Sequence, residues 1–193
     1  MIHFSFDDKK ATDAATYLLS LSGGILPCSE LLRHLYIADR ISLSEYHSSI
    51  TTDSYSSTAS GPVCSNIYAC IRNYSTLPSS SPWRKVICIE GDKVRLIDVD
   101  RTYDMLSDEE KDILELANGS LLTDFPECKK PGDDITIEDI ISATVKDNIN
   151  RQESLSDLNL SAEIQRINYI KKNNYLLSLI ESQSPWTSDI PPF

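Results

Sequence analysis

The clearest hydrophobic pattern lies between Leu31 and Tyr74, where two apolar stripes of helical spacing flank a polar stretch. Leu31, Leu35 and Asp39 recur every four residues, so one side of the first helix is apolar and carries a carboxylate. A second stripe begins at Val63, directly after a Gly-Pro pair that breaks the pattern. The pattern predicts a helix that ends at residue 41 or continues to residue 46, then a crossing loop, then a second helix.

The other periodic segments predict further helices and one β-hairpin. A stripe over residues 8–21 stops at a Ser-Gly-Gly run, a capping box opens a helix at Ser107, and Thr136 caps another helix. Residues 83–89 and 93–99 alternate apolar and polar side chains on both sides of a Glu-Gly-Asp turn, which is typical of a hairpin. We therefore expect a mainly α fold with a small β-hairpin (α+β), arranged as a compact helical bundle.

The pattern changes after residue 146. Residues 147–159 are polar and predict a linker, and an apolar stripe over residues 160–180 predicts a last helix, which could dock on the body or offer a contact face. Trp186 lies in an extended tail that could enter a groove of a partner or of a second copy of the chain. We expect a domain over residues 1–146 and a C-terminal segment over residues 147–193.

Composition places the chain among soluble globular proteins, because 40% of its 193 residues are hydrophobic and 24% are charged. Five cysteines without a Cys-x-x-Cys pair predict free thiols in a reducing cytosol, and hence a cytoplasmic protein. We expect no signal peptide and no membrane association, because the first residues reach Asp7 and Asp8 at once and no apolar run has the length of a membrane span.

The net charge of −11 is concentrated in the second half of the chain, where residues 104–139 hold 12 acidic and 3 basic side chains. Such a chain is a poor binder of nucleic acid and suits a basic protein surface better. Glu109, Glu110 and Asp112 lie on the outer face of the helix after Ser107 and are candidate partner contacts. The alternative is a solvated helix start, where acids are favoured by the helix dipole.

Catalytic and metal-binding signatures are missing from the sequence. There is no phosphate-binding loop, no nucleophile elbow, no zinc-ligand spacing and no catalytic-cysteine motif, so we expect neither a cofactor nor a metal. His34 is expected to be a surface or hydrogen-bonded histidine rather than a base. Asp39 either caps backbone amides of residues 51–55 or pairs with an arginine, or it contacts a partner directly; a hydrolase that uses Asp39 near Tyr36 is a further hypothesis.

The polar stretch over residues 47–61 predicts a loop rich in serine and threonine, with a short strand as one option. Tyr55 within it could be an exposed aromatic contact for a protein partner, or it could fill the core beneath the loop. Gly61 and Pro62 are expected to form a turn and the start of the following helix.

The order of these motifs resembles a known family. Residues 35–40 read L-Y-x-A-D-R, residues 50–55 read I-T-x-D-x-Y, and G-P-V and I-Y follow at residues 61–63 and 67–68. This succession resembles the Panacea (SocA-like) antitoxin domain family, and the similarity spans roughly residues 8–145. The chain departs from the family pattern at Thr123, where many members have His, and at Cys128, where many have Trp.

The resemblance implies an antitoxin that neutralises a cognate toxin by stoichiometric protein binding, without turnover. A branch of the family implies the alternative, a proteolytic adaptor that delivers a bound toxin to an AAA+ protease. Under either reading we expect no enzyme and no direct contact with nucleic acid or membrane. The expected partner contacts are Tyr55, Glu109, Glu110, Asp112 and Trp186. The expected scaffold residues are Tyr36, Asp39, Gly61 and Pro62.

Overall fold

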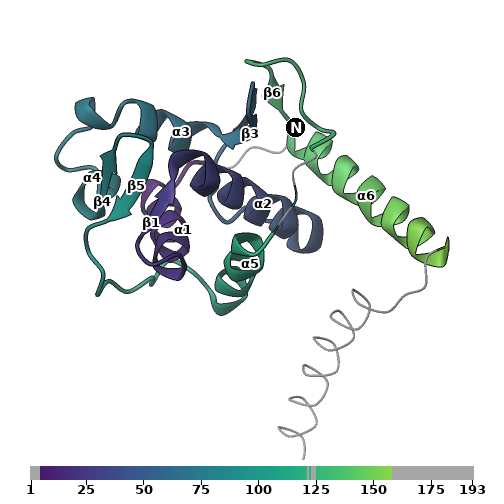
Figure 1. Ribbon diagram of the computed structural model, residues 1–193, viewed down its shortest axis with the longest axis horizontal. Coiled ribbons are helices and arrows are strands. Elements are labelled where there is room, and N and C mark those ends of the chain that lie inside the picture. Colours follow the sequence, from purple (N-terminus) through teal and green to yellow (C-terminus); the bar gives the residue numbers. More distant parts are fainter. Residues whose placement is uncertain (1–4, 121, 123–124, 158–193) are drawn as a thin grey trace, which may run out of the picture. The chain divides into compact units, whose positions relative to one another are not determined.

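The computed structural model describes residues 5–120, 122 and 125–157 (Figure 1). The chain divides into two compact units, residues 1–147 and 148–193. The elements in chain order are α1 (Asp8–Leu21), β1 (Ile25–Pro27), α2 (Cys28–Tyr46), β2 (Tyr55–Thr58), β3 (Gly61–Cys64), α3 (Ser65–Arg72), the 3₁₀ turn η1 (Tyr74–Thr76), α4 (Pro82–Val86), β4 (Ile87–Glu90), β5 (Lys93–Leu96), α5 (Asp108–Asn118), β6 (Asp134–Ile135) and α6 (Ile137–Asp157).

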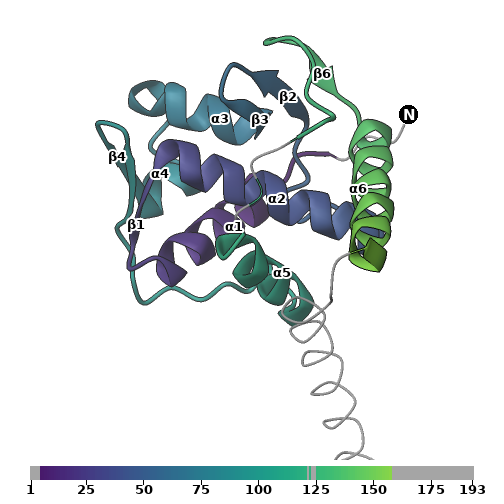
Figure 2. The same ribbon diagram turned by 45° about the vertical axis from the view of Figure 1, so that its right-hand side comes forward.

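Helix α2 lies at the centre of the first unit and packs against α1, α5, α3 and β3 (Figure 2). Its length confirms the longer of the two predicted helix ends. The side chains from Leu31 to Leu43 are buried on nearly every side of the helix, and they include the polar His34, Asp39 and Arg40. A helix buried all round is typical of a core position. Its polar side chains must therefore find partners inside the protein.

The first sheet has the order β1-β5-β4 and is antiparallel throughout. Its β4–β5 part confirms the predicted hairpin around Gly91. Residues 83–86 are helical rather than extended, because Pro82 stands in the first turn of α4 and Trp83 is buried beneath it. The sequence pattern did not predict β1, a three-residue strand that pairs with β5.

The second sheet has the order β3-β2-β6 and was largely missed by the sequence pattern. Gly61 and Pro62 belong to β3, so the prediction that they begin the following helix is wrong; α3 starts at Ser65. Gly61 has φ +117°, which favours glycine after the two-residue hairpin loop. Pro62 is tolerated because β3 is an edge strand: its paired residue Ser57 donates its N–H to the other side, to the Asp133 carbonyl.

The predicted helix starts are confirmed at three places. The Asp7 carboxylate accepts from the backbone N–H groups of Lys9 and Lys10 at the start of α1. Ser107 and Glu110 form the predicted capping box of α5. In the first turn of α6, Asp139 donates its N–H to the hydroxyl of Thr136, the residue before the helix, and its carboxylate accepts from the Thr136 N–H.

Helix α6 is longer than expected, because its backbone stays helical to Asp157, where the sequence predicts a linker. Residues 147–157 contain neither Pro nor Gly, so nothing in the local sequence ends the helix. The predicted last helix and Trp186 lie outside the described residues.

Helices and two small antiparallel sheets together confirm an α+β fold. The compact helical bundle is not confirmed, since both sheets contribute buried residues to the core. No helix within the described part of the chain is long and apolar enough to cross a membrane.

Candidate functional site

Asp39 is fully buried in the C-terminal half of α2, and its carboxylate accepts hydrogen bonds from the following loop and, at 3.9 Å, from the Cys64 thiol. Its Oδ1 accepts from the Ser49 hydroxyl at 3.1 Å and from the backbone N–H groups of Ile50 and Thr51 at 2.7 and 2.9 Å. Its Oδ2 accepts from the Thr51 hydroxyl and from the Tyr55 phenol at 3.0 Å. The interpretation of Asp39 as a cap for backbone amides of this loop is confirmed, whereas the expected arginine partner is not found.

The electrostatics of this cluster follow from burial. Burial raises the pKa of Asp39, while the hydrogen bonds from Thr51, Tyr55 and Ile50 act in the opposite direction. Burial also raises the pKa of the Cys64 thiol, and the nearby Asp39 carboxylate raises it further. Asp39 is 0% exposed, so in this conformation its carboxylate is closed off from solvent.

Asp53, a second buried carboxylate, lies in the loop itself and caps the start of α3. Its Oδ1 accepts from the Asn66 backbone N–H at 2.9 Å and from the Asn66 amide at 2.7 Å, and its Oδ2 accepts from the Ile67 N–H at 3.0 Å. The residue at the N-cap position itself, Cys64, makes no side-chain capping bond. Asp53 therefore supplies the acceptors that free helix N-termini require.

Thr52 connects the same loop to α1. Its hydroxyl accepts from the Asp7 backbone N–H at 2.8 Å, and its own N–H donates to the Ser49 hydroxyl at 2.8 Å. Thr52 has φ +54°, a left-handed conformation that β-branched residues rarely adopt. Residues 49–55, called the hub loop below, thus contact three helices. Thr52 accepts from the start of α1, Ile50 donates to Asp39 of α2, and Asp53 caps α3.

A second buried polar cluster surrounds Glu127, a residue to which the sequence analysis assigned no role. Glu127 is 5% exposed; it accepts from the Tyr36 phenol at 2.8 Å and pairs with Arg40 at 2.9 Å. Arg40 also pairs with Asp147 of α6. Burial, followed by the Glu127 carboxylate, raises the pKa of Tyr36. Glu127 lies 91 residues after Tyr36, so no local sequence pattern links the two.

Tyr55 does not occupy the exposed position that its predicted contact role required. It is 2% exposed, and its ring meets the Tyr36 ring edge to face at 5.7 Å between centroids. The expected exposure of Tyr55 is therefore wrong, and the alternative, a side chain that fills the core beneath the loop, is confirmed. A contact between Tyr55 and a partner stays a prediction. Its hydroxyl is satisfied by Asp39, which is why a phenol can be buried here.

The predicted acidic contacts differ in their surroundings. Glu109 and Asp112 are exposed on α5, whereas the Glu110 carboxylate is partly buried, completes the capping box and pairs with Lys10 of α1 at 2.6 Å. Helix α5 runs beside α1 in the same direction: Tyr17 of α1 donates to Glu115, and Ser22, the residue after α1, donates to Asn118. Whether these acids bind a partner remains a proposal.

The remaining titratable groups show no built catalytic centre in the described residues. His34 is buried, and burial followed by the neighbouring Arg33 lowers its pKa, so it is held neutral. All five cysteines are free thiols. Within residues 5–120, 122 and 125–157, no three His, Cys, Asp or Glu side chains are grouped as a metal site would require.

Comparison with known proteins identifies the family. The family model for the antitoxin SocA-like, Panacea domain matches residues 31–178. No curated protein and no solved structure matches the chain significantly. The match begins at α2 rather than near residue 8, and it extends beyond residue 145 into the segment that the sequence analysis placed outside the resemblance. It covers more than half of the chain and includes the two buried carboxylates, Asp39 and Asp53. The chain therefore belongs to the antitoxin SocA-like Panacea domain family.

Proposed function

We propose that this protein is the antitoxin of a toxin–antitoxin pair and neutralises its cognate toxin by direct, stoichiometric binding. The observation that carries the proposal is the family match over residues 31–178. The geometry supports binding rather than chemistry, because the polar residues of the family motifs saturate one another inside the core. Such a cluster rigidifies a scaffold.

The contact surface we propose is the outer face of α5. Glu109 and Asp112 are exposed there, and Leu116, one turn further on, is 56% exposed. The opposite face of α5 packs on α1 and α2 through Ile113, Leu114 and Ala117, so the helix is held firmly. An acidic helix face with an apolar residue suits a basic partner surface that also buries some apolar area.

Coexpression with the product of the neighbouring gene tests the function. Growth should be rescued while both proteins persist, and purification should yield a complex of fixed stoichiometry. Rescue that coincides with loss of the toxin, and that depends on an AAA+ protease, would replace direct neutralisation by the adaptor mechanism. Absence of rescue, with no complex formed, would contradict both.

Charge reversal of the α5 face tests the surface. The double variant Glu109→Lys/Asp112→Lys should weaken the complex, because it places two positive charges where a basic surface approaches. Asp98→Lys/Asp100→Lys changes the net charge by the same amount at exposed positions outside α5 and is the matched control. Equal affinities of the two double variants would assign the binding surface elsewhere. Glu110 is left unchanged, since its replacement would also break the capping box.

A further inference from the structure

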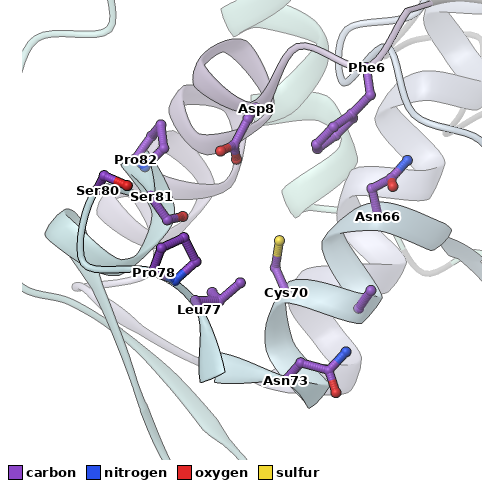
Figure 3. A pocket seen from close by; sticks show the side chains of 11 residues that line it. Phe6, Asp8, Asn66, Cys70, Asn73, Leu77, Pro78, Ser80, Ser81 and Pro82 are labelled. Atoms are coloured by element: carbon purple, nitrogen blue, oxygen red, sulfur yellow. The ribbon is translucent and has the colours of Figure 1, made fainter. Parts of the chain in front are cut away.

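A groove of about 530 Å³ opens between the start of α1, α3 and the connector before α4 (Figure 3). The Phe6 ring and the Cys70 thiol point into it from opposite sides. Its walls also include Ala69, Leu77 and Pro78. Polar side chains line it as well, namely Asn66, Asn73, Ser80 and Ser81. An open groove that offers both apolar and hydrogen-bonding contacts suits an extended peptide.

Asp8 is the one charged residue that lines the groove. Among the residues that the structure describes, no hydrogen bond or ion pair reaches its carboxylate. Burial and the neighbouring Asp7 raise the pKa of Asp8. Burial and then the Asp8 carboxylate raise the pKa of Cys70 to about 11, so the field of Asp8 extends across the groove.

We propose that this groove binds an extended apolar peptide segment of a partner protein, with a lysine or arginine of that segment placed against Asp8. Charge complementarity selects this occupant: a cation would pair a half-buried carboxylate that has no partner, whereas an acidic segment would be repelled. The groove lies on elements other than α5, so it is a second contact surface. We take the toxin to be the protein that supplies this peptide, and that step alone rests on the proposed function.

Synthetic peptides test the groove on the full chain. We would titrate the ¹⁵N-labelled protein with Ac-Leu-Lys-Leu-Pro-Leu-NH₂ and with the same peptide carrying Glu in place of Lys. The Lys peptide should shift the amide signals of Ala69, Cys70 and Asn73 with a Kd on the order of 1 mM, a range expected for a short ligand. It should bind about fivefold more tightly than the Glu peptide, as one partly screened ion pair provides.

Matched variants separate the charge from the shape of the groove. Asp8→Asn should reduce the Lys-over-Glu preference to less than about twofold, while Asp98→Asn, an exposed acid outside the groove, should keep it. Ala69→Trp should fill the groove and abolish binding of both peptides. Ala59→Trp, a similar change at the exposed β2–β3 turn, should not.

Three outcomes would overturn the inference. The first is no amide shift with either peptide, and the second is equal binding of both peptides to the unaltered chain. The third is binding that appears only after residues 1–4 are removed, which would make the chain's own start the occupant. Failure with peptides leaves toxin rescue untouched, and failure of rescue leaves the peptide result standing, so the two proposals fail separately.

Discussion

At the scale of single residues, the Asp39 carboxylate holds the hub loop in place through its hydrogen bonds. Asp39→Asn keeps the size of the side chain but turns one acceptor oxygen into a donor that faces the Thr51 and Tyr55 hydroxyls. We expect a loss of about 3 kcal/mol in the free energy of unfolding, because buried donors lose their charged acceptor. Urea denaturation measures it.

Asp98→Asn is the control for Asp39→Asn, and it should change stability by less than about 0.5 kcal/mol because Asp98 is exposed. An Asp39→Asn protein with unchanged stability would contradict the scaffold role. If such a protein had also lost its biological effect, Asp39 would have to act on a substrate or partner after all.

Tyr55→Phe separates a core role from a contact role at the corrected position. It removes the hydroxyl bonded to Asp39 and keeps the ring packed on Tyr36. We expect stability to fall by about 1.5 kcal/mol and toxin affinity to stay within about twofold. Isothermal titration of the toxin complex is the measurement, and a tenfold loss of affinity at full folding would restore Tyr55 as a contact.

At the scale of elements, the start of α6 provides a pH-dependent test. The Lys129 ammonium and then the Thr136 N–H lower the pKa of Asp139 from the usual 3.8 to about 2. Since the folded state holds this carboxylate ionised to lower pH, its contribution to stability is present above pH 3.8. That contribution is lost as the pH falls from 3.8 through about 2.

Carbon-detected NMR titration of Asp139 should therefore show a midpoint near pH 2 in the native chain. In Lys129→Met the midpoint should move up toward 3.8, while overall stability at neutral pH changes little because both groups are partly exposed. If the midpoint is the same in Lys129→Met, the hydrogen bond from the Thr136 N–H is sufficient to lower the pKa of Asp139.

Elements with local signals could be predicted from the sequence, and elements held by distant contacts could not. The box at Ser107, the cap at Thr136 and the turn at Gly91 each act within four residues of the chain, and each was found. Strands β1 and β6 are three and two residues long and owe their extension to partners more than 60 residues away. So short a segment carries no readable period.

The candidate site divides in the same way. The side of α2 that carries Asp39, and its role as an amide cap, followed from helical spacing and the cost of burying a charge. The capping of α3 by Asp53 did not, because the donor and acceptor lie 13 and 14 residues apart across a hairpin. The pairing of Glu127 with Arg40 spans a longer separation still and requires the tertiary fold.

At the scale of the whole molecule, the net charge of −11 should govern the speed of complex formation. We expect the association rate with a basic toxin to fall about tenfold between low salt and physiological salt. Glu109→Lys/Asp112→Lys should lower the rate at low salt about fivefold and flatten its dependence on salt. Stopped-flow mixing gives both quantities.

The control for the rate measurement is again Asp98→Lys/Asp100→Lys, which should reproduce only the part of the effect due to total charge. If both double variants slow association equally, long-range attraction by the whole chain accounts for the rate, and the α5 face has no privileged part in it.

The proline in strand β3 has a consequence for how copies of this chain behave when crowded. Pro62 is buried in the folded chain. When the segments that cover this edge open, position 62 offers no hydrogen to an incoming backbone, so a foreign strand can pair there only with a gap in its ladder. Pro62→Val would fit the same extended geometry and restore the missing donor. We expect the Pro62→Val protein to form fibrils in concentrated samples in which the natural chain does not.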